Sequence, residues 1–196
     1  MMKFTSRCSF AFPVLFALSA CGGSSGDGTP EPPPEETPPD EALSTLAERE
    51  DFAAAVLAQQ VALVESGAVD PADLPASASY AGEWAMSLDP DGDLEVIGGA
   101  AELQADFEAG TLSGDLQQEI LAGAEGTLAV QDGQIVGADI TGDVAGNLDG
   151  SAGISDVDAE LDGFVTTDGV QATMDGSATR DGEVVSSQGA VAANAE

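Results

Sequence analysis

The sequence contains no histidine, and its single lysine, Lys3, lies at the start of the chain. Without histidine there is no imidazole general base, no Ser-His-Asp triad, no histidine metal site and no histidine haem ligand. Lysine Schiff-base chemistry is likewise excluded from everything after Lys3. A catalytic site would have to use carboxylates and hydroxyls alone. The sequence therefore predicts a protein that is not an enzyme and that needs no cofactor.

Cysteine and positive charge are scarce as well. The two cysteines, Cys8 and Cys21, both lie near the N-terminus, so no disulfide framework or cysteine zinc site is expected. The sequence has four Lys and Arg residues and 36 Asp and Glu residues, which gives a formal net charge of −32. Such a charge repels nucleic acid and anionic lipid head groups and excludes both as partners. It indicates an acidic surface that keeps an extracytoplasmic protein soluble, with attraction of basic proteins or divalent cations as the alternative.

Residues 1–20 have the features of a secretion leader. Lys3 and Arg7 precede a short apolar run, Phe10–Leu18, which is too short to span a bilayer. Leu18-Ser19-Ala20-Cys21-Gly22 resembles a bacterial lipobox, which implies a lipid anchor on Cys21, and Gly22 after the cysteine is typical of sorting to the outer membrane. Residues 21–40 are rich in Gly, Ser, Pro and Glu and are predicted to be an extended tether.

One amphipathic helix is predicted over residues 41–67, capped by Asp40 and ended by Gly67. Its apolar residues recur at steps of three and four, with one step of seven, and so form one face of the helix. This face is expected to pack on the outer wall or the mouth of the following domain, and the alternative is that the helix serves as a spacer. The apolar residues are Leu43, Leu46, Ala53, Leu57, Val61 and Val64. Pro71 and Pro75 interrupt the pattern, so residues 68–78 are predicted to be a linker.

From residue 79 to 196 the period is two, which is typical of half-buried strands. In the segment 98–114, Ala101, Leu103, Ala105 and Phe107 alternate with polar residues, and a turn over 108–110 leads into a second strand. Two-residue hairpins are predicted at Asp132-Gly133, Asp168-Gly169 and Asp181-Gly182. A helical turn is predicted near Ile120 and a glycine-rich loop over 147–155. About eight strands with tight turns predict an all-β protein, a small antiparallel up-and-down barrel.

Residues 74–196 resemble the C-terminal barrel of the transferrin-binding protein B-like lipoproteins, a group that also resembles the factor H-binding surface lipoproteins. The resemblance rests on Leu74-Pro75 followed by Tyr80-Ala81-Gly82, on Gly99–Gly114, on Gly163-Phe164 and on the closing repeat from Asp175-Gly176-Ser177 to Gly189-Ala190-Val191. It implies a barrel that binds without chemistry. The larger members have two lobes, and their transferrin-gripping residues have no counterpart here, so no binding residue carries over.

Three candidate sites follow from the residues. Asp89–Glu95 (DPDGDLE) alternates carboxylates like a calcium loop, but Gly92 is at position four and Ala100 at position twelve, so an acidic turn is expected. The second is a ligand site inside the barrel. Tyr80, Trp84 and Phe107 are expected to fill the interior instead, which leaves no room for a ligand there. Glu83 and Asp106 are the third, a carboxylate pair that alternation directs into water.

The sequence thus predicts a lipoprotein of a Gram-negative outer membrane, held by lipid on Cys21. Its barrel is expected to bind an extracytoplasmic protein or solute through loops and acidic outer strands. The alternative is an accessory envelope lipoprotein with no dedicated ligand. The cell surface is the expected location, and the periplasmic face of the membrane is the alternative.

Overall fold

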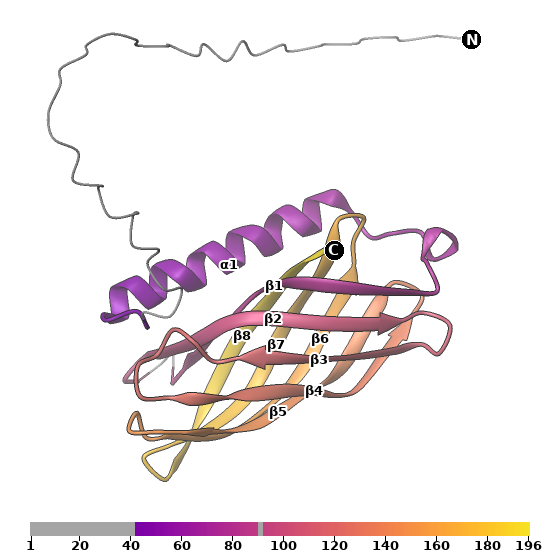
Figure 1. Ribbon diagram of the computed structural model, residues 1–196. Coiled ribbons are helices and arrows are strands. Elements are labelled where there is room, and N and C mark those ends of the chain that lie inside the picture. The colour runs from indigo at the N-terminus through magenta and orange to yellow at the C-terminus, as the bar shows by residue number, and fades with distance from the viewer. Residues whose placement is uncertain (1–41, 90–91) are drawn as a thin grey trace, which may run out of the picture. The chain divides into compact units, whose positions relative to one another are not determined.

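The structure, a computed structural model, describes residues 42–89 and 92–196 of the 196-residue chain. The predicted leader, the lipidation site Cys21, the tether and the Asp40 cap lie outside the described residues. The described part holds one α-helix, α1 (Leu46–Ser66), one short 3-10 helix, η1 (Pro71–Asp73), and eight strands (Figure 1). None of its helices is both long and apolar enough to cross a membrane.

The eight antiparallel strands close into a barrel in sequence order, with β8 paired back onto β1. This confirms the predicted up-and-down barrel. Each strand lies beside the next one in the chain because short turns join them. The strands are β1 (Ser77–Leu88), β2 (Glu95–Asp106), β3 (Thr111–Gln117), β4 (Glu125–Val136), β5 (Asp139–Asp149), β6 (Ile154–Val165), β7 (Gly169–Arg180) and β8 (Glu183–Ala195).

One Asp-Gly hairpin is confirmed and another is wrong. Asp181 and Gly182, with φ of 51° and 83°, form the two-residue turn between β7 and β8. Asp132-Gly133 instead lies inside β4, where both residues oppose the single residue Gly142 of β5 and form a β-bulge. Asp132 has φ of 48°, and a positive φ serves a bulge as well as a hairpin turn. The hairpin between β4 and β5 comes later, at 137–138.

Three other connections differ from the prediction. Residues 118–124 form no helical turn, because the Gln118 side chain accepts from the Gly98 amide and donates to the carbonyls of Leu121 and Ala124. The loop predicted over 147–155 shrinks to 150–153, since the residues on either side pair in β5 and β6. Asp168-Gly169 belongs to a longer turn, closed by the pairing of Val165 with Val170.

The barrel interior is filled by apolar side chains from all eight strands. Trp84 is fully buried, and its indole Nε1 donates to the Gln117 carbonyl at 2.9 Å. Tyr80, four residues earlier on β1, is buried in the same cluster, and burial raises the pKa of the Tyr80 phenol. Phe107 lies in the turn between β2 and β3, half-buried against the cluster. The prediction that these aromatic residues fill the interior is therefore confirmed for Tyr80 and Trp84, while Phe107 covers one edge of it.

Ser187 of β8 is 1% exposed, and among the described residues its hydroxyl is a buried side-chain oxygen with no hydrogen-bond partner. A buried hydroxyl without a partner costs its desolvation energy. Ser187→Ala is therefore expected to stabilise the protein by about 1 kcal/mol in urea unfolding. The adjacent exposed Ser186→Ala is the control and is expected to change stability by less than about 0.5 kcal/mol. A destabilised Ser187→Ala variant would show that the hydroxyl is bonded in solution.

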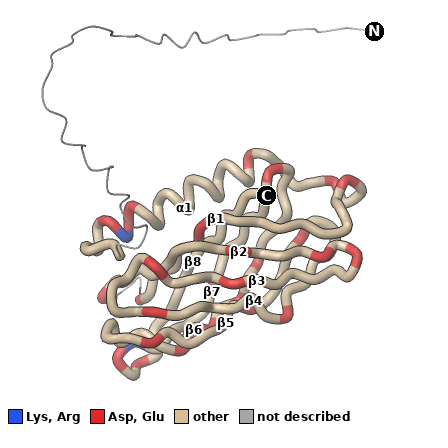
Figure 2. The backbone as a smooth tube through the Cα atoms, viewed as in Figure 1, with Lys and Arg blue, Asp and Glu red and all other residues tan. Residues whose placement is uncertain are grey.

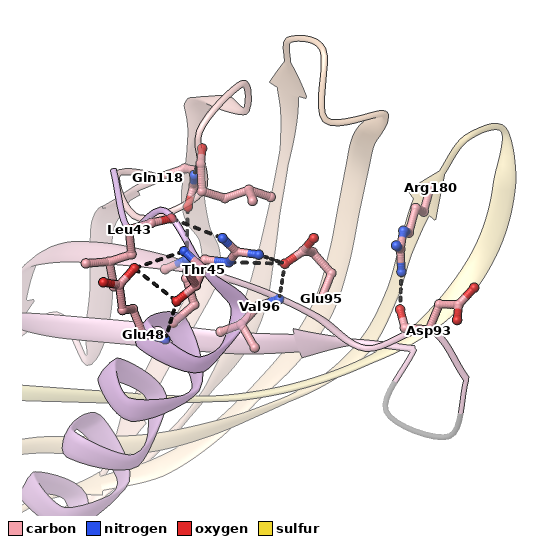
Figure 3. Close-up of polar contacts among 11 residues, drawn as sticks. Leu43, Thr45, Glu48, Asp93, Glu95, Val96, Gln118 and Arg180 are labelled. Carbon is pink, nitrogen blue, oxygen red and sulfur yellow. Dashed lines mark hydrogen bonds and ion pairs between the residues drawn. The ribbon is translucent and has the colours of Figure 1, made fainter. Parts of the chain in front are cut away.

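The helix begins five residues later than predicted, at Leu46 rather than at Glu41. Thr45 caps it: the Thr45 hydroxyl accepts from the Glu48 amide, and the Glu48 carboxylate accepts from the Thr45 amide (Figure 3). This reciprocal capping box satisfies two backbone donors at once and fixes the start there. The helix ends at Ser66, before Gly67, as predicted.

The capping box makes the first turn of α1 sensitive to acid. Hydrogen bonds from the Ser44 hydroxyl, and then from the Thr45 amide and hydroxyl, hold the pKa of Glu48 below its ordinary value of 4.5. A carboxylate with a lowered folded pKa stabilises the fold above its unfolded pKa, and this contribution is lost as the pH falls through the folded value. Amide protection at 46–49 should thus decline as the pH falls below 4.5, and the Glu48 carboxyl should titrate below 4.5 by NMR. Glu48→Gln keeps an acceptor but no titration, so a decline of equal size in that variant would contradict this prediction.

The helix packs on the outer wall of the barrel, against β8, β1, β2 and β7 (Figure 1). A second apolar cluster joins Val56 and Leu63 of α1 to Ala85 of β1 and to Ala190 and Ala192 of β8. Alternation would expose these three alanines, and their small side chains let the helix approach the wall closely. The helix–barrel contact is thus built into the sequence of the strands as well as that of the helix.

The helix face that packs on the wall differs from the predicted apolar face, of which Ala53 alone packs against the second apolar cluster. The other packed side chains are Arg49, Phe52, Val56, Gln60 and Leu63. Two of them are polar and find partners on the barrel: Gln60 donates to the Gln171 side chain and to the Ala172 carbonyl, and Arg49 bonds Glu95. Buried polar groups are tolerated when they are hydrogen-bonded. Arg49 and Gln60 therefore lie on the packed face of the helix although polar residues usually indicate the solvent-exposed face.

Candidate functional site

A stripe of apolar side chains on α1 is exposed on the flank of the helix rather than packed in the barrel contact. Leu46, Leu57, Val61 and Val64 are 37%, 52%, 57% and 46% exposed. With about 3.6 residues per turn, these four residues fall on one flank of the helix, roughly a quarter turn from the packed residues. We refer to them as the apolar stripe. They belong to the face that the sequence pattern had placed against the barrel.

A groove of about 490 Å³ runs between this flank of α1 and the barrel wall. Ala53 and Leu57 of α1 form one side, and the segments 173–175 of β7 and 188–190 of β8 form the other, together with Ala85 and Ser87 of β1. Leu57 belongs both to the groove and to the apolar stripe. The groove and the stripe therefore make one continuous apolar surface beside the helix.

Carboxylates border the groove on its β7 side. Asp175 lines the groove and is directly opposite Glu160 of β6, which is itself directly opposite Asp143 of β5. Asp158 and Asp162 lie on either side of Glu160 at the two-residue spacing that keeps them on the outer face. We call these five exposed residues the acidic patch. Like charges directly opposite one another on neighbouring strands destabilise a sheet, so the patch repels itself.

The two arginines outside the predicted leader are engaged elsewhere. Arg49 forms an ion pair with Glu95 at 2.6 Å and also donates to the Leu43 carbonyl. Figure 3 shows Glu95 and Leu43 near the start of α1. The ion pair between Arg49 and Glu95 connects the helix to β2. Arg180 donates to the Asp93 carbonyl. Figure 2 accordingly shows acidic residues across the strands and basic residues at two places in the described part of the chain.

The segment Asp89–Glu95, for which the sequence predicts an acidic turn rather than a calcium loop, is described apart from Pro90 and Asp91. The Asp89 carboxylate accepts from the Asp93 amide, so it closes its own turn. Glu95 points to Arg49 rather than into the loop. Within residues 42–89 and 92–196, no group of three or more carboxylates is arranged to hold a metal ion. The loop residues that the structure describes therefore serve the turn and the helix contact.

The candidate carboxylates Glu83 and Asp106 are both exposed, as the alternation predicts, and they do not pair. Glu83 is opposite Ala100, whereas Asp106 is opposite Ser77, so the two acids lie at different levels of the same pair of strands. Neither carboxyl has the close partner or the burial that carboxylate catalysis requires.

The chain matches no protein-family model, and no curated protein matches it.

Sequence reasoning missed the groove and the acidic patch. The patch depends on the register that places Asp143, Glu160 and Asp175 in one row across three strands, and register is not visible within any single strand. The apolar stripe was visible as a pattern but was assigned to the wrong surface. A second stripe at helical spacing, Phe52, Val56 and Leu63, was present in the sequence and is the signal that could have corrected this.

Proposed function

We propose that the chain is an outer-membrane lipoprotein, anchored through lipid on Cys21, whose barrel and helix form a non-catalytic binding module at the cell surface. The leader, the lipobox around Cys21 and the following Pro-Glu tether support the anchoring. The ligand is an extracytoplasmic protein or solute. The absence of histidine from the sequence, and of lysine after Lys3, supports binding without chemistry.

The observation that carries the binding role is the continuous apolar surface beside α1. The barrel interior is packed with side chains, so a ligand has to bind on the outside. Exposed apolar surface next to a groove marks interaction sites when it is contiguous. Here the apolar stripe and the groove of about 490 Å³ meet at Leu57.

Resemblance to the transferrin-binding protein B-like lipoproteins supports the same proposal. The motifs that carry it lie within the described residues, most of them in the barrel, for example Gly163-Phe164 near the end of β6. The fold that this family implies is an antiparallel barrel, which is the fold observed. Membership of the family is part of the proposal, and transferrin is not proposed as the ligand.

A capture experiment tests the binding role. The full-length protein, immobilised in nanodiscs of zwitterionic lipid, is exposed to extracytoplasmic and envelope proteins and washed at about 0.5 M salt, which screens exposed charges beyond a few ångströms. A protein that remains bound at a fixed stoichiometry supports a binding module. If every contact is lost with salt, the acidic surface explains it, and the alternative, an accessory lipoprotein with no dedicated ligand, replaces the proposal.

Cys21→Ser tests the anchor. The serine hydroxyl does not form the thioether that carries the lipid, so incorporation of a labelled fatty acid should fall to background and the protein should leave the membrane fraction. Cys8→Ser is the matched control and should retain both lipid and membrane association, because residue 8 lies within the predicted leader. In cells that carry the wild-type protein, added protease should remove it from the intact surface; protection would assign it to the periplasmic face. Unchanged labelling of Cys21→Ser would contradict the anchor.

A further inference from the structure

The surface beside α1 has two properties that together restrict its ligand. The contiguous part of the apolar stripe is Leu57, Val61 and Val64, about 11 Å along the helix axis at 1.5 Å per residue, and the exposed Glu50 separates it from Leu46 on the same face. The acidic patch lies on the far side of the groove, beginning with Asp175. An occupant that covers both needs an apolar face and positive charge along one edge.

We infer that this surface binds a basic amphipathic helix of a partner protein. The inference rests on the proposed binding role and names the class of partner. Such a helix would place its apolar face on Leu57, Val61 and Val64 and its Lys or Arg side chains over Asp175 and Glu160, the two members of the acidic patch nearest the groove. Leu57, Val61 and Val64 have i, i+4 and i+7 spacing, and an amphipathic partner helix presents its apolar side chains at the same spacing.

Charge complementarity decides between this occupant and the others. A second copy of the chain carries the same formal charge of −32, so two acidic patches would face each other across a dimer. Anionic lipid is repelled for the same reason. A basic helix instead neutralises the directly opposed pair Glu160 and Asp175, which lacks any cation of its own among the described residues. Binding thus relieves a repulsion present in the free protein.

Synthetic peptides of about 20 residues test the inference. One has Leu and Ala on one helical face and Lys on the other; the second has the same composition in a scrambled order that is not amphipathic. Affinity for the full-length protein in zwitterionic nanodiscs is measured by fluorescence anisotropy, and empty nanodiscs give the background. The amphipathic peptide is expected to bind one per chain and at least about tenfold more tightly than the scrambled one.

Variants then locate the site. Leu57→Asn with Val61→Asn should weaken amphipathic peptide binding at least about tenfold, and both positions are exposed enough for the substitutions to leave folding intact. The matched control is Val136→Asn with Val184→Asn, at two exposed valines outside the groove lining, 73% and 76% exposed, which should bind like the wild type.

A charge series tests the acidic patch. Glu160→Gln with Asp175→Asn should weaken binding several-fold at low salt and progressively less at high salt. Glu102→Gln with Asp115→Asn removes a directly opposed acidic pair from β2 and β3 and should have a smaller effect.

Three results would overturn the inference: equal binding of the scrambled peptide, unchanged affinity of the Leu57→Asn/Val61→Asn variant, or self-association of the wild type that this variant abolishes. If a protein captured at high salt still binds that variant, the binding role stands and the groove assignment fails. If no protein is captured at high salt and the scrambled peptide binds equally, both fail.

Discussion

Trp84→Ala is expected to destabilise the protein by about 3–5 kcal/mol, because it removes the largest fully buried side chain in the barrel. The substitution leaves a cavity in a cluster shared by all eight strands and deprives the Gln117 carbonyl of its indole donor. Small domains have a total stability of about 5–15 kcal/mol, so the loss is a large share of it. Urea unfolding followed by far-ultraviolet circular dichroism measures the effect without relying on the single tryptophan.

Trp84→Phe separates the two contributions. It retains most of the apolar volume and loses the hydrogen bond to Gln117, so a cost of about 1–2 kcal/mol is expected. If Trp84→Ala unfolds within about 1 kcal/mol of the wild type, the interior is not the packed core described here, and a ligand cavity inside the barrel becomes the better account.

Val56→Asp is expected to release α1 from the barrel wall. Val56 is completely buried between α1 and the outward-facing alanines of β1 and β8. An unpaired carboxylate at that position costs about 3–5 kcal/mol, which the protein avoids by exposing the helix. Hydrogen exchange should then show lost protection over residues 46–66 and retained protection in the barrel strands.

Leu57→Asp is the matched control, since it introduces the same carboxylate at the next residue. Leu57 is 52% exposed, so this change should alter stability by less than about 0.5 kcal/mol while impairing peptide binding. Equal loss of helix protection in the two variants would show that α1 does not pack through the Val56 face.

The barrel was predictable because its signals are local. Alternation such as Val157 to Asp162 in β6 assigns each side chain to the core or to water, and turns such as Asp181-Gly182 join neighbouring strands. Asp132-Gly133 shows the limit of such signals: the same dipeptide serves a bulge when the partner strand continues past it. Only the pairing with β5 distinguishes the two cases.

The candidate site was not predictable because its determinants are non-local. Arg49 and Gln60 appear polar in the sequence, yet each is buried by a partner 46 and 111 residues away, Glu95 and Gln171. The helix packs on the barrel with Arg49 and Gln60, together with Val56 and Leu63, toward the wall, and Leu57 and Val61 are therefore exposed to solvent. The spacing of apolar residues alone does not predict this orientation of α1, because it assigns the most apolar helix face to the core.

The most direct test of binding on the outside of the barrel is hydrogen exchange of the full-length protein with and without a partner that survives the high-salt wash. The account predicts increased protection of α1 over residues 46–64 and of β7 and β8 around 173–175 and 188–190, with little change in β3 and β4. Protection confined to the loops at the barrel ends, or slower exchange throughout the interior strands without protection of α1, would contradict it.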